Sequence, residues 1–470
     1  MRHVSMTIDG EAVDTADRVE VLNPATEDVV GSVPLCASDG VDDAMAAAAS
    51  AFATWRAVDE HERRGLLAKA VDEVETQLAD LTQMLTLEQG KTLADARLEL
   101  LASLELFRYF LNEPLPEVSL PPRDGDSVVV TRRPIGVVAA ITPWNFPVHL
   151  AVSKVAPAVV TGNTVVLKPS PFTPMTTLAI GALMARHLPA GVLNVISGGD
   201  ELGRAMTSHR TPRKISFTGS VATGKHVAAS AATDLKRVTL ELGGNDAAIV
   251  LPDADVDALV KPLFWSAFAN SGQICAAVKR VYVHAGAYER LARGLADYAA
   301  RVRVGDGSDP ASRLGPVNNR PQFERVLELL DDAVSNGATA LNERVPYERG
   351  YFVAPTIVVG ATDEMRLVDE EQFGPVLPVL PYDDVDEAVA RANGGRFGLS
   401  GSVWGGDTER AADVAAKLDC GTVWVNSHLV FSPDQPISGH KWSGIGVENG
   451  IAGLESYTEL QVLRGRSSHS

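Results

Sequence analysis

The middle of the chain alternates between short apolar strands and helices, and this pattern constrains the fold more than any other feature. We predict strands at 137–141, 164–168, 193–196 and 214–218, each rich in valine, isoleucine or other apolar residues and separated by helical segments. Such strands are typical of a parallel sheet that is covered by helices. A second strand–helix series runs from residue 247 to about 425. The sequence therefore predicts an α/β protein.

The segments on either side of this region have other patterns. Residues 39–110 carry charges at helical spacing, and the proline-rich stretch 113–122 looks like a connector. The segment 127–133 is β-branched, and we expect it to be one arm of a protruding hairpin. The tail at 456–465 has strand character and is its predicted partner. At 470 residues the chain is long enough for two or three domains.

Charge and cysteine content exclude several classes of function. The formal net charge of −18 argues against nucleic acid or an anionic membrane as a partner. Only three cysteines occur, Cys36, Cys275 and Cys420. We therefore expect no disulfide framework, and we expect a cytoplasmic location. The chain shows no signal-peptide pattern and no apolar run of membrane-spanning length. We expect no metal site.

Cys275 is the candidate nucleophile. It follows Gly272 and Gln273 in a segment where glycine permits a tight backbone turn, and we expect a nearby helix N-terminus to stabilise its thiolate. The alternative is an inert buried cysteine, which is the commoner situation for a lone cysteine. Cys36 and Cys420 are better explained by packing or by turns.

Glu241 and Asn145 are candidates for the other catalytic tasks. Glu241 ends an apolar strand and precedes Gly243 and Gly244, so it can be a buried base with a raised pKa, although most glutamates are solvated surface groups. Asn145 lies in the turn after the strand 137–141, where its amide can stabilise an oxyanion. Turn chemistry alone also explains an asparagine there.

A strand–glycine–helix turn at 217–224 is the candidate phosphate site. The spacing of Gly219 and Gly224 matches neither the dinucleotide fingerprint nor a P-loop, but backbone N–H groups at such a turn can bind a pyrophosphate. Lys168 ends another strand and can bond ribose hydroxyls, although many strands simply end in a solvated lysine.

Seven motifs together resemble the aldehyde dehydrogenase superfamily over essentially the whole chain. They lie at 142–147, 167–170, 217–220 with 224, 241–245, 270–275, 371–376 and 441–446. The resemblance implies a Rossmann-type cofactor domain, an α/β catalytic domain and a small β oligomerisation element. The cofactor domain would take residues 1–117 and 133–242, the catalytic domain 243–438, and the oligomerisation element and tail 118–132 and 439–470.

The resemblance also implies a mechanism. The Cys275 thiolate would attack an aldehyde to give a thiohemiacetal, whose oxyanion is held by the Asn145 amide and the Cys275 backbone N–H. Hydride transfer to the nicotinamide would leave a thioester, and Glu241 would activate the water that releases a carboxylic acid. Lys154 matches a lysine that lies near the active site in the family.

The implied cofactor is NAD or NADP. Pro171 stands where the family often has a glutamate that repels a 2′-phosphate, so the preference between the two stays open. The implied cofactor-binding residues are Thr142, Pro143, Trp144, Lys168, Ser170, Gly203, Phe217, Thr218, Gly219, Ser220, Gly224, Leu242, Glu371 and Phe373.

We expect a small aldehyde as substrate and a homodimer or homotetramer as the assembly, because exposed strand edges tend to pair. The expected tunnel residues are Val148, His149, Trp265, Phe268, His428 and Phe431. Their apolar and aromatic character favours an uncharged aldehyde, and the absence of an arginine among them disfavours succinate semialdehyde.

Three alternatives remain. The first is a semialdehyde dehydrogenase of the same fold. The second is a CoA-acylating aldehyde dehydrogenase, against which Glu241 argues because transfer to CoA needs no water-activating base. The third is a catalytically idle binding protein, against which the joint presence of Cys275, Glu241 and Asn145 argues.

Overall fold

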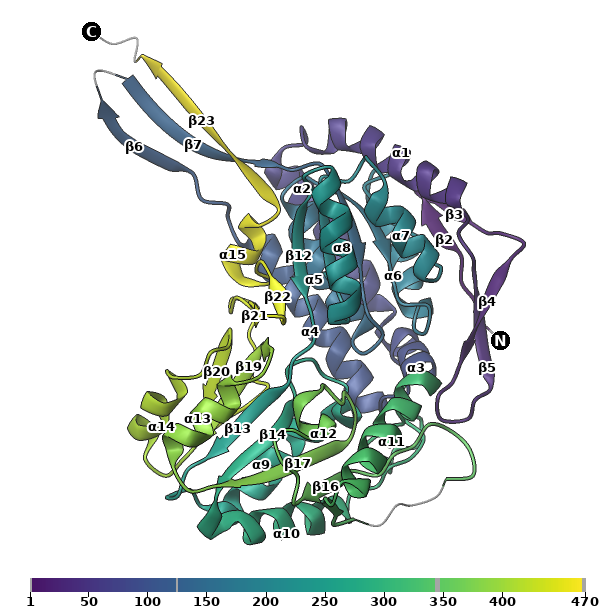
Figure 1. The fold of residues 1–470 in the computed structure, drawn as a ribbon. Coiled ribbons are helices and arrows are strands. Elements are labelled where there is room, and N and C mark those ends of the chain that lie inside the picture. The colour runs from purple at the N-terminus through teal and green to yellow at the C-terminus, as the bar shows by residue number, and fades with distance from the viewer. Residues whose placement is uncertain (1, 124–125, 343–346, 467–470) are drawn as a thin grey trace.

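Two helix-covered sheets and one protruding arm make up the computed structural model, which describes residues 2–123, 126–342 and 347–466 (Figure 1). The first sheet has eight strands in the order β22-β12-β11-β8-β9-β10-β2-β3. Its five central strands are parallel: β8 (Val137–Ile141), β9 (Thr164–Lys168), β10 (Leu193–Val195), β11 (Lys214–Thr218) and β12 (Arg237–Glu241). The edges are antiparallel: β2 (Met6–Ile8) with β3 (Glu11–Val13), and β22 (Gly444–Ile445). The predicted α/β pattern is confirmed.

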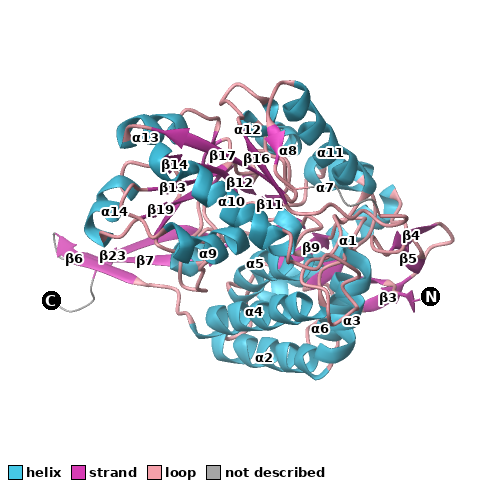
Figure 2. Ribbon diagram, turned by 90° about the horizontal axis from the view of Figure 1, so that it is seen from below, coloured by secondary structure: helices cyan, strands magenta, loops and turns pink. Residues whose placement is uncertain are grey.

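Helices cover both faces of this sheet, whose strands β8 to β11 are buried along their whole length. One face is covered by α1 (Ser38–Trp55), α7 (Asp200–Ser208) and α8 (Val221–Thr233). The other face carries α5 (Pro147–Val160) and α6 (Met175–Ala185). Helices α2 (Glu60–Thr76), α3 (Leu78–Gln89) and α4 (Leu93–Asn112) form a further layer outside these two, visible in Figure 2. A small sheet of β1 (Arg2–His3), β4 (Arg18–Leu22) and β5 (Val29–Pro34) lies beside them.

The second sheet has seven strands in the order β15-β16-β17-β14-β13-β19-β20. Its strands are β13 (Asp246–Val250), β14 (Val278–His284), β15 (Thr339–Ala340), β16 (Thr356–Val359), β17 (Val376–Tyr382), β19 (Ser400–Trp404) and β20 (Thr422–Val425), and only β15 is antiparallel. One apolar core lies under α9 (Val256–Phe268) and α10 (Tyr288–Ala299). The other core lies under α11 (Arg320–Ser335), α13 (Val385–Asn393) and α14 (Thr408–Ala415).

The chain passes from one sheet to the other within four residues. Glu241 is the last residue of β12 in the first sheet, and Asp246 is the first of β13 in the second. Gly243 and Gly244 lie between them, and a Cβ atom on Gly244 would be 2.6 Å from the carbonyl oxygen of Cys275. Glycine is therefore required where the Glu241 strand end approaches the cysteine turn.

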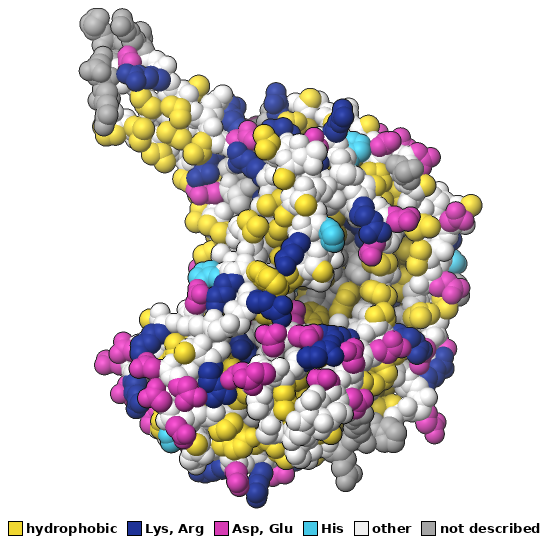
Figure 3. All heavy atoms as spheres, viewed as in Figure 1, with side chains coloured by type: hydrophobic (Ala, Val, Ile, Leu, Met, Phe, Trp, Pro, Cys, Tyr) yellow, Lys and Arg dark blue, Asp and Glu magenta, His cyan; other side chains and the backbone are white. Residues whose placement is uncertain are grey.

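The arm consists of three antiparallel strands, β6 (Val118–Arg123), β7 (Asp126–Pro134) and β23 (Thr458–Arg466). The predicted hairpin and its pairing with the C-terminal tail are confirmed. The expectation of a connector at 113–122 is wrong from residue 118 onward, because Val118 and its neighbours pair with β7 despite their prolines. Such prolines are tolerated on an edge strand. Hydrophobic side chains gather on the arm in Figure 3.

Candidate active site

A cavity of 440 Å³ lies between the two sheets and contains the candidate catalytic residues. Its walls come from α4, the first turns of α5, the turn after the short helix η1 (Ala269–Gly272), and the loop at 429–437. Cys275, Glu241 and Asn145 all line it. The fold thus brings together three side chains that are up to 130 residues apart in the sequence, counted as 275 minus 145.

The turn that carries Cys275 is tightly fixed. Asn270, Ser271 and Gly272 have φ values of 50°, 56° and 74°, an unusual run of left-handed residues. The Ser271 hydroxyl donates to the carbonyl oxygen of Gly315 at 2.7 Å, and a Cβ atom on Gly272 would be 2.4 Å from the carbonyl oxygen of Gly374. These contacts over-determine the strained backbone and hold the cysteine in place.

The expectation that a helix N-terminus stabilises the Cys275 thiolate is wrong. The residue follows the C-terminal end of α9 and the short helix η1, and it leads into β14. Burial and the charge of Glu241 raise the pKa of the Cys275 thiol well above its usual value, while Lys279 lowers it. The other two cysteines are not among the residues that line the cavity, and burial raises the pKa of Cys36 to about 11 and that of Cys420 to about 12.

Glu241 is buried at the end of β12 and has the environment of a base. Neither of its carboxylate oxygens has a hydrogen-bond partner among the described residues. Burial, followed by the charge of Glu448, raises the pKa of Glu241 to about 8. A carboxylate with a pKa near neutrality can take a proton from water and release it again.

Asn145 is fixed by the same turn as the cysteine. Its side-chain Nδ2 donates to the carbonyl oxygen of Gln273 at 2.9 Å, which uses one of the two amide hydrogens. Its own carbonyl oxygen accepts from the ammonium of Lys91 at 2.9 Å, and Lys91 is paired with Glu99. Among the described residues no second acceptor for this amide is found, so its other hydrogen can serve a ligand in the cavity.

Lys154 does not line the cavity but reaches it through Glu448. Its ammonium donates to the hydroxyl of Thr218 at 2.7 Å and to the Glu448 carboxylate at 2.5 Å. Glu448 lines the cavity and also accepts from Ser153. The sequence alone assigns no role to Glu448. The sequence gives little signal for it, because its position next to Lys154 depends on a contact across 294 residues.

The candidate cofactor residues lie at the carboxyl ends of β8, β9, β11 and β12. Ser220 caps α8 by accepting from the N–H of Thr223 at 3.2 Å, so the start of this helix follows the phosphate-site candidates Phe217, Thr218 and Gly219. Leu242 packs against Gly224, where a Cβ atom would be 2.5 Å from a leucine methyl group. Ser170, Pro143 and Gly203 lie in the same region, with Gly203 beside the Lys168 side chain.

Two polar groups in this region have a weak hydrogen-bond partner or none among the described residues, and this fits a bound nucleotide. The hydroxyl of Thr142 is buried without a hydrogen bond among the described residues. Within the described part of the chain, the Lys168 ammonium makes one long contact, 3.4 Å to the carbonyl oxygen of Pro169, and burial lowers the pKa of Lys168 to about 8. Buried polar atoms are normally paired, so ribose hydroxyls or phosphates are suitable partners for these groups.

Glu371 and Phe373 approach this region from the second sheet. The Glu371 carboxylate accepts from the Gly244 N–H at 3.1 Å, and burial raises its pKa to about 7. Phe373 has a φ of 47°, and its ring lies edge-on to Trp144 with centroids 5.4 Å apart. The two sheets therefore meet at the candidate cofactor residues.

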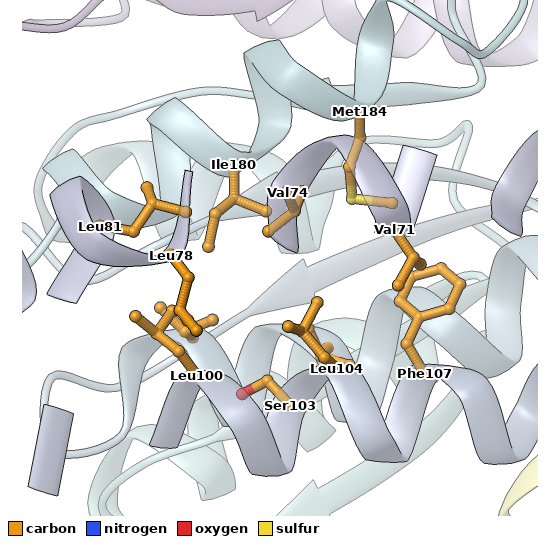
Figure 4. Close-up of a pocket in the computed structure, with 12 residues that line it drawn as sticks. Val71, Val74, Leu78, Leu81, Leu100, Ser103, Leu104, Phe107, Ile180 and Met184 are labelled. Carbon is orange, nitrogen blue, oxygen red and sulfur yellow. The ribbon is translucent and has the colours of Figure 1, made fainter. Parts of the chain in front are cut away.

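Of the expected tunnel residues, only His149 and Phe431 line the cavity. Val148 instead faces a small apolar cavity of 20 Å³ between α2, α4 and α6, which Figure 4 shows. Val148 and His149 are neighbours on α5 whose side chains project in different directions, and here each faces a different cavity.

The other three expected tunnel residues lie elsewhere as well. Phe268 is in the second-sheet core against Phe264, and the Trp265 indole donates to the hydroxyl of Tyr298. His428 is buried, with its Nε2 at 2.7 Å from the carbonyl oxygen of Ala276. These three side chains pack against other aromatic rings or bond to polar groups under α9 and beneath the cysteine turn, and these contacts hold them away from the cavity.

The fold and the site combine a thiol and a buried carboxylate in one cavity with candidate cofactor residues at the ends of neighbouring strands, an arrangement that suits an oxidoreductase. The sequence model of the aldehyde dehydrogenase family matches residues 12–463. A Pseudomonas protein named "Probable aldehyde dehydrogenase" is 42% identical over 98% of this chain and 94% of its own length. The chain belongs to the aldehyde dehydrogenase family, and its reaction is the NAD(P)-dependent oxidation of an aldehyde.

Solved structures agree with this assignment. The NAD+ complex of an aldehyde dehydrogenase from Bacillus cereus has a TM-score of 0.96 at 36% identity, covering 99% of this chain and 97% of that one. An NADP dependent enzyme of E. coli has a TM-score of 0.96 at 35% identity, covering 99% and 98%. The overall fold predicted from the motifs is confirmed. No helix in the described ranges is long and apolar enough to cross a bilayer.

Proposed function

We propose that Cys275, Glu241 and Asn145 carry out this oxidation, and that its product is a free carboxylic acid. The observation that carries the proposal is that these three side chains line one cavity. Thr142, Lys168 and Glu371 would hold NAD or NADP, whose nicotinamide accepts a hydride when bound.

The three residues divide the tasks of the proposed reaction among them. The Cys275 sulfur forms a bond to the aldehyde carbon, and the Asn145 amide and the Cys275 N–H stabilise the resulting oxyanion. Loss of hydride leaves a thioester on the sulfur. Glu241 then takes a proton from water as the water oxygen attacks the thioester carbon, and cleavage of the C–S bond returns the Cys275 thiolate.

Glu241 also supports water as the acyl acceptor. A CoA-acylating enzyme needs no base for hydrolysis, whereas this chain keeps a buried carboxylate with a pKa of about 8 in the same cavity as the thiol. The ionised carboxylate raises the pKa of the Cys275 thiol, so it hinders the first step. Because Glu241 disfavours the attack of the Cys275 thiol on the aldehyde, its presence is best explained by the need for a base in the later hydrolysis of the thioester.

We propose an uncharged aldehyde as the substrate because the cavity offers no free cation. Lys91 is the one lysine or arginine among the described lining residues, and it is buried and paired with Glu99. Asp95 and Glu105 add negative charge to the α4 wall, and burial lowers the pKa of His149, so the imidazole is neutral near pH 7. Anionic semialdehydes would therefore be repelled.

A comparison of aldehydes tests this substrate class. We expect a neutral aldehyde such as hexanal or phenylacetaldehyde to have a kcat/KM at least about tenfold above that of succinate semialdehyde. The variant Glu105→Lys would narrow the ratio, while Arg97→Gln, an exposed residue on the same helix outside the cavity lining, serves as the control. Preference for the anionic substrate would exclude the proposal. Running each assay with both NAD and NADP gives the cofactor preference.

The arm supports a homo-oligomer, either a dimer or a tetramer. Large apolar side chains on it are exposed, including Leu460 at 65% and Val462 at 61%.

The predicted domains, at 1–117 with 133–242, 243–438, and 118–132 with 439–470, are supported by the change of sheet at 242–245. Residues 1, 124–125, 343–346 and 467–470 of these ranges lie outside the described residues. A thiol that must stay reduced supports a cytoplasmic location.

Replacement of the nucleophile is the direct test of the proposed chemistry. We expect Cys275→Ala to abolish aldehyde oxidation while cofactor binding, measured by quenching of tryptophan fluorescence, is retained. Cys420→Ala is the matched control, because its thiol is also partly buried but is not among the cavity-lining residues. Full activity of Cys275→Ala would contradict the mechanism.

A further inference from the structure

The surroundings of Cys275 are unfavourable for a thiolate. The residue is partly buried, the carboxylates of Glu241 and Glu371 both raise its pKa, and it does not lie at the start of a helix. Asp246 lies nearby on β13 and is a third buried carboxyl group. A nucleophile in such a place needs a compensating positive charge.

Lys279 is the cation that the cysteine turn encloses. It lies on β14, its residue is 2% exposed, and its ammonium donates to the carbonyl oxygen of Ile274 at 2.5 Å. Longer contacts reach the carbonyl oxygens of Cys275 at 3.4 Å and Ala277 at 3.5 Å. Across the part of the chain that the structure describes, no ion pair of Lys279 is formed, so contact with a carboxylate does not neutralise its charge.

The Phe373 ring closes the other side of this ammonium. The Lys279 nitrogen lies 5.5 Å from the ring centroid, within the range of a cation–π contact. The ammonium is therefore held between the cysteine turn and an aromatic ring. A lysine in this position cannot turn into solvent without leaving three carbonyl oxygens with fewer donors.

The bond to Ile274 fixes the direction of the Cys275 N–H. The chain has no cis peptide bond among its described residues, and in a trans peptide the C=O and the following N–H point in opposite directions. Because the Ile274 carbonyl is directed at Lys279, the N–H of Cys275 points away from it. The same carbonyl also accepts from Ala277, so two donors fix this peptide plane.

We propose that Lys279 is a positioning residue for the nucleophile, which orients the Cys275 N–H as an oxyanion donor and stabilises the thiolate by its charge. The inference deepens the proposed function and rests on Cys275 being the nucleophile. The charges that face the thiol are Glu241, Glu371 and Lys279, and of these only Lys279 lowers its pKa. Lys279 lowers the pKa values of Glu371 and Asp246 as well, which agrees with a charge placed among these carboxyl groups.

The pH dependence of Cys275 alkylation tests the charge. Iodoacetamide labelling of the Cys275 peptide, followed by mass spectrometry without substrate or cofactor, reports the thiolate fraction. We expect Lys279→Met to move the midpoint to higher pH by about one unit, so that labelling near pH 7.5 slows about tenfold. Lys279→Arg keeps the charge and should restore most of the rate. An unchanged midpoint in Lys279→Met would overturn the proposal.

Two further variants separate this effect from loss of structure. Lys236→Met removes a buried ammonium that bonds the carbonyl oxygen of Thr207, and we expect it to leave the Cys275 midpoint unchanged. Lys279→Gln keeps a donor for Ile274 without the charge, and a midpoint shift in this variant with normal cofactor binding supports the proposal even where Lys279→Met is unstable. A Lys279→Gln midpoint equal to wild type would overturn it.

The proposed function can fail independently. If Cys275→Ala oxidises aldehydes at the wild-type rate, the thiol is not the nucleophile, whatever the alkylation shows. If Cys275→Ala is inactive and the alkylation midpoint does not depend on Lys279, only the role of Lys279 is excluded. The alkylation experiment uses no turnover, so the two results do not depend on each other.

Discussion

The charge of Glu241 acts in opposite directions on the two halves of the proposed reaction. When ionised, Glu241 raises the pKa of the Cys275 thiol and so disfavours attack on the aldehyde. The same ionised form is needed to take a proton from water. Burial raises the pKa of Glu241 to about 8, which keeps the carboxyl group largely protonated at neutral pH in the free enzyme. Thiol attack and water activation are thus favoured by different protonation states of Glu241.

A dependence of deacylation on pH follows from this pKa. An acid with its pKa raised to about 8 is protonated below that value, so the base form is lost as the pH falls. We expect the rate of thioester hydrolysis, measured in single turnovers, to fall about tenfold per pH unit below about pH 8. In Glu241→Gln the remaining slow hydrolysis should lack this titration. A wild-type rate that is constant from about pH 6 to pH 8 would contradict the assignment of the base.

The sequence identifies single reactive residues more easily than their partners. The positions of Cys275 and Glu241 follow from short motifs, and the structure places both in the cavity. Lys279 and Glu448 were missed because their effect depends on contacts in three dimensions. The sequence does carry one signal, because two cationic residues, Lys279 and Arg280, lie inside the otherwise apolar segment 276–283, where a buried charge needs a partner.

At the scale of elements, two glycines near the site differ in what a substitution would disturb. At Gly243 it would disturb a functional side chain, and at Gly272 it would disturb the backbone of the cysteine turn. A Cβ atom on Gly243 would lie 2.1 Å from the Glu371 carboxylate, which is the mobile end of a side chain. A Cβ atom on Gly272 would lie 2.4 Å from the Gly374 carbonyl oxygen, which is backbone, and Gly272 also has a positive φ. The first clash can be relieved by moving a functional group, whereas the second cannot.

Replacing each glycine by alanine should therefore give different results. We expect Gly243→Ala to displace Glu371 and raise the dissociation constant for the cofactor about tenfold, with a change in stability below about 1 kcal/mol. Gly272→Ala should lower the free energy of unfolding by about 1–3 kcal/mol because it strains the cysteine turn. Fluorescence titration and denaturant unfolding measure the two effects. Normal cofactor affinity in Gly243→Ala would argue against a role for Glu371 in binding.

Strands and helices were predictable from periodicity, but the side of an element that faces the cavity was not. The buried strands at 137–141 and 214–218 agree with β8 and β11 because apolar β-branched runs have few other structures available. Val148 and His149 are neighbours on α5, and only their packing against α4 and α6 decides which one faces the cavity. The left-handed residues Asn270 and Ser271 likewise depend on tertiary contacts.

At the scale of the whole molecule, the arm is the part least explained by a single chain. Its three strands leave Leu460, Val462 and Leu463 exposed, although apolar side chains of this size are normally covered. The arm also joins segments 118–134 and 458–466, which are far apart in the sequence. A second copy of the chain is the proposed cover for this surface.

Polar substitutions on the arm test that proposal. We expect the double variant Leu460→Ser with Val462→Ser to sediment as a smaller species than wild type, since it removes exposed apolar area from the proposed contact. Leu235→Ser is the control, because Leu235 is 86% exposed but lies at the end of α8. If the double variant and Leu235→Ser both sediment with the same mass as the wild-type assembly, the arm does not hold the assembly together.

The central claim is that the acyl group passes through Cys275 before water receives it, and trapping that thioester tests it most directly. Glu241→Gln would be mixed with a neutral aldehyde and the cofactor, quenched with acid after the first turnover, and digested for mass spectrometry. We predict a burst of about one reduced cofactor per subunit and an acyl adduct on the peptide that contains Cys275. A burst with no adduct on that peptide, or steady turnover at the wild-type rate, would contradict the account.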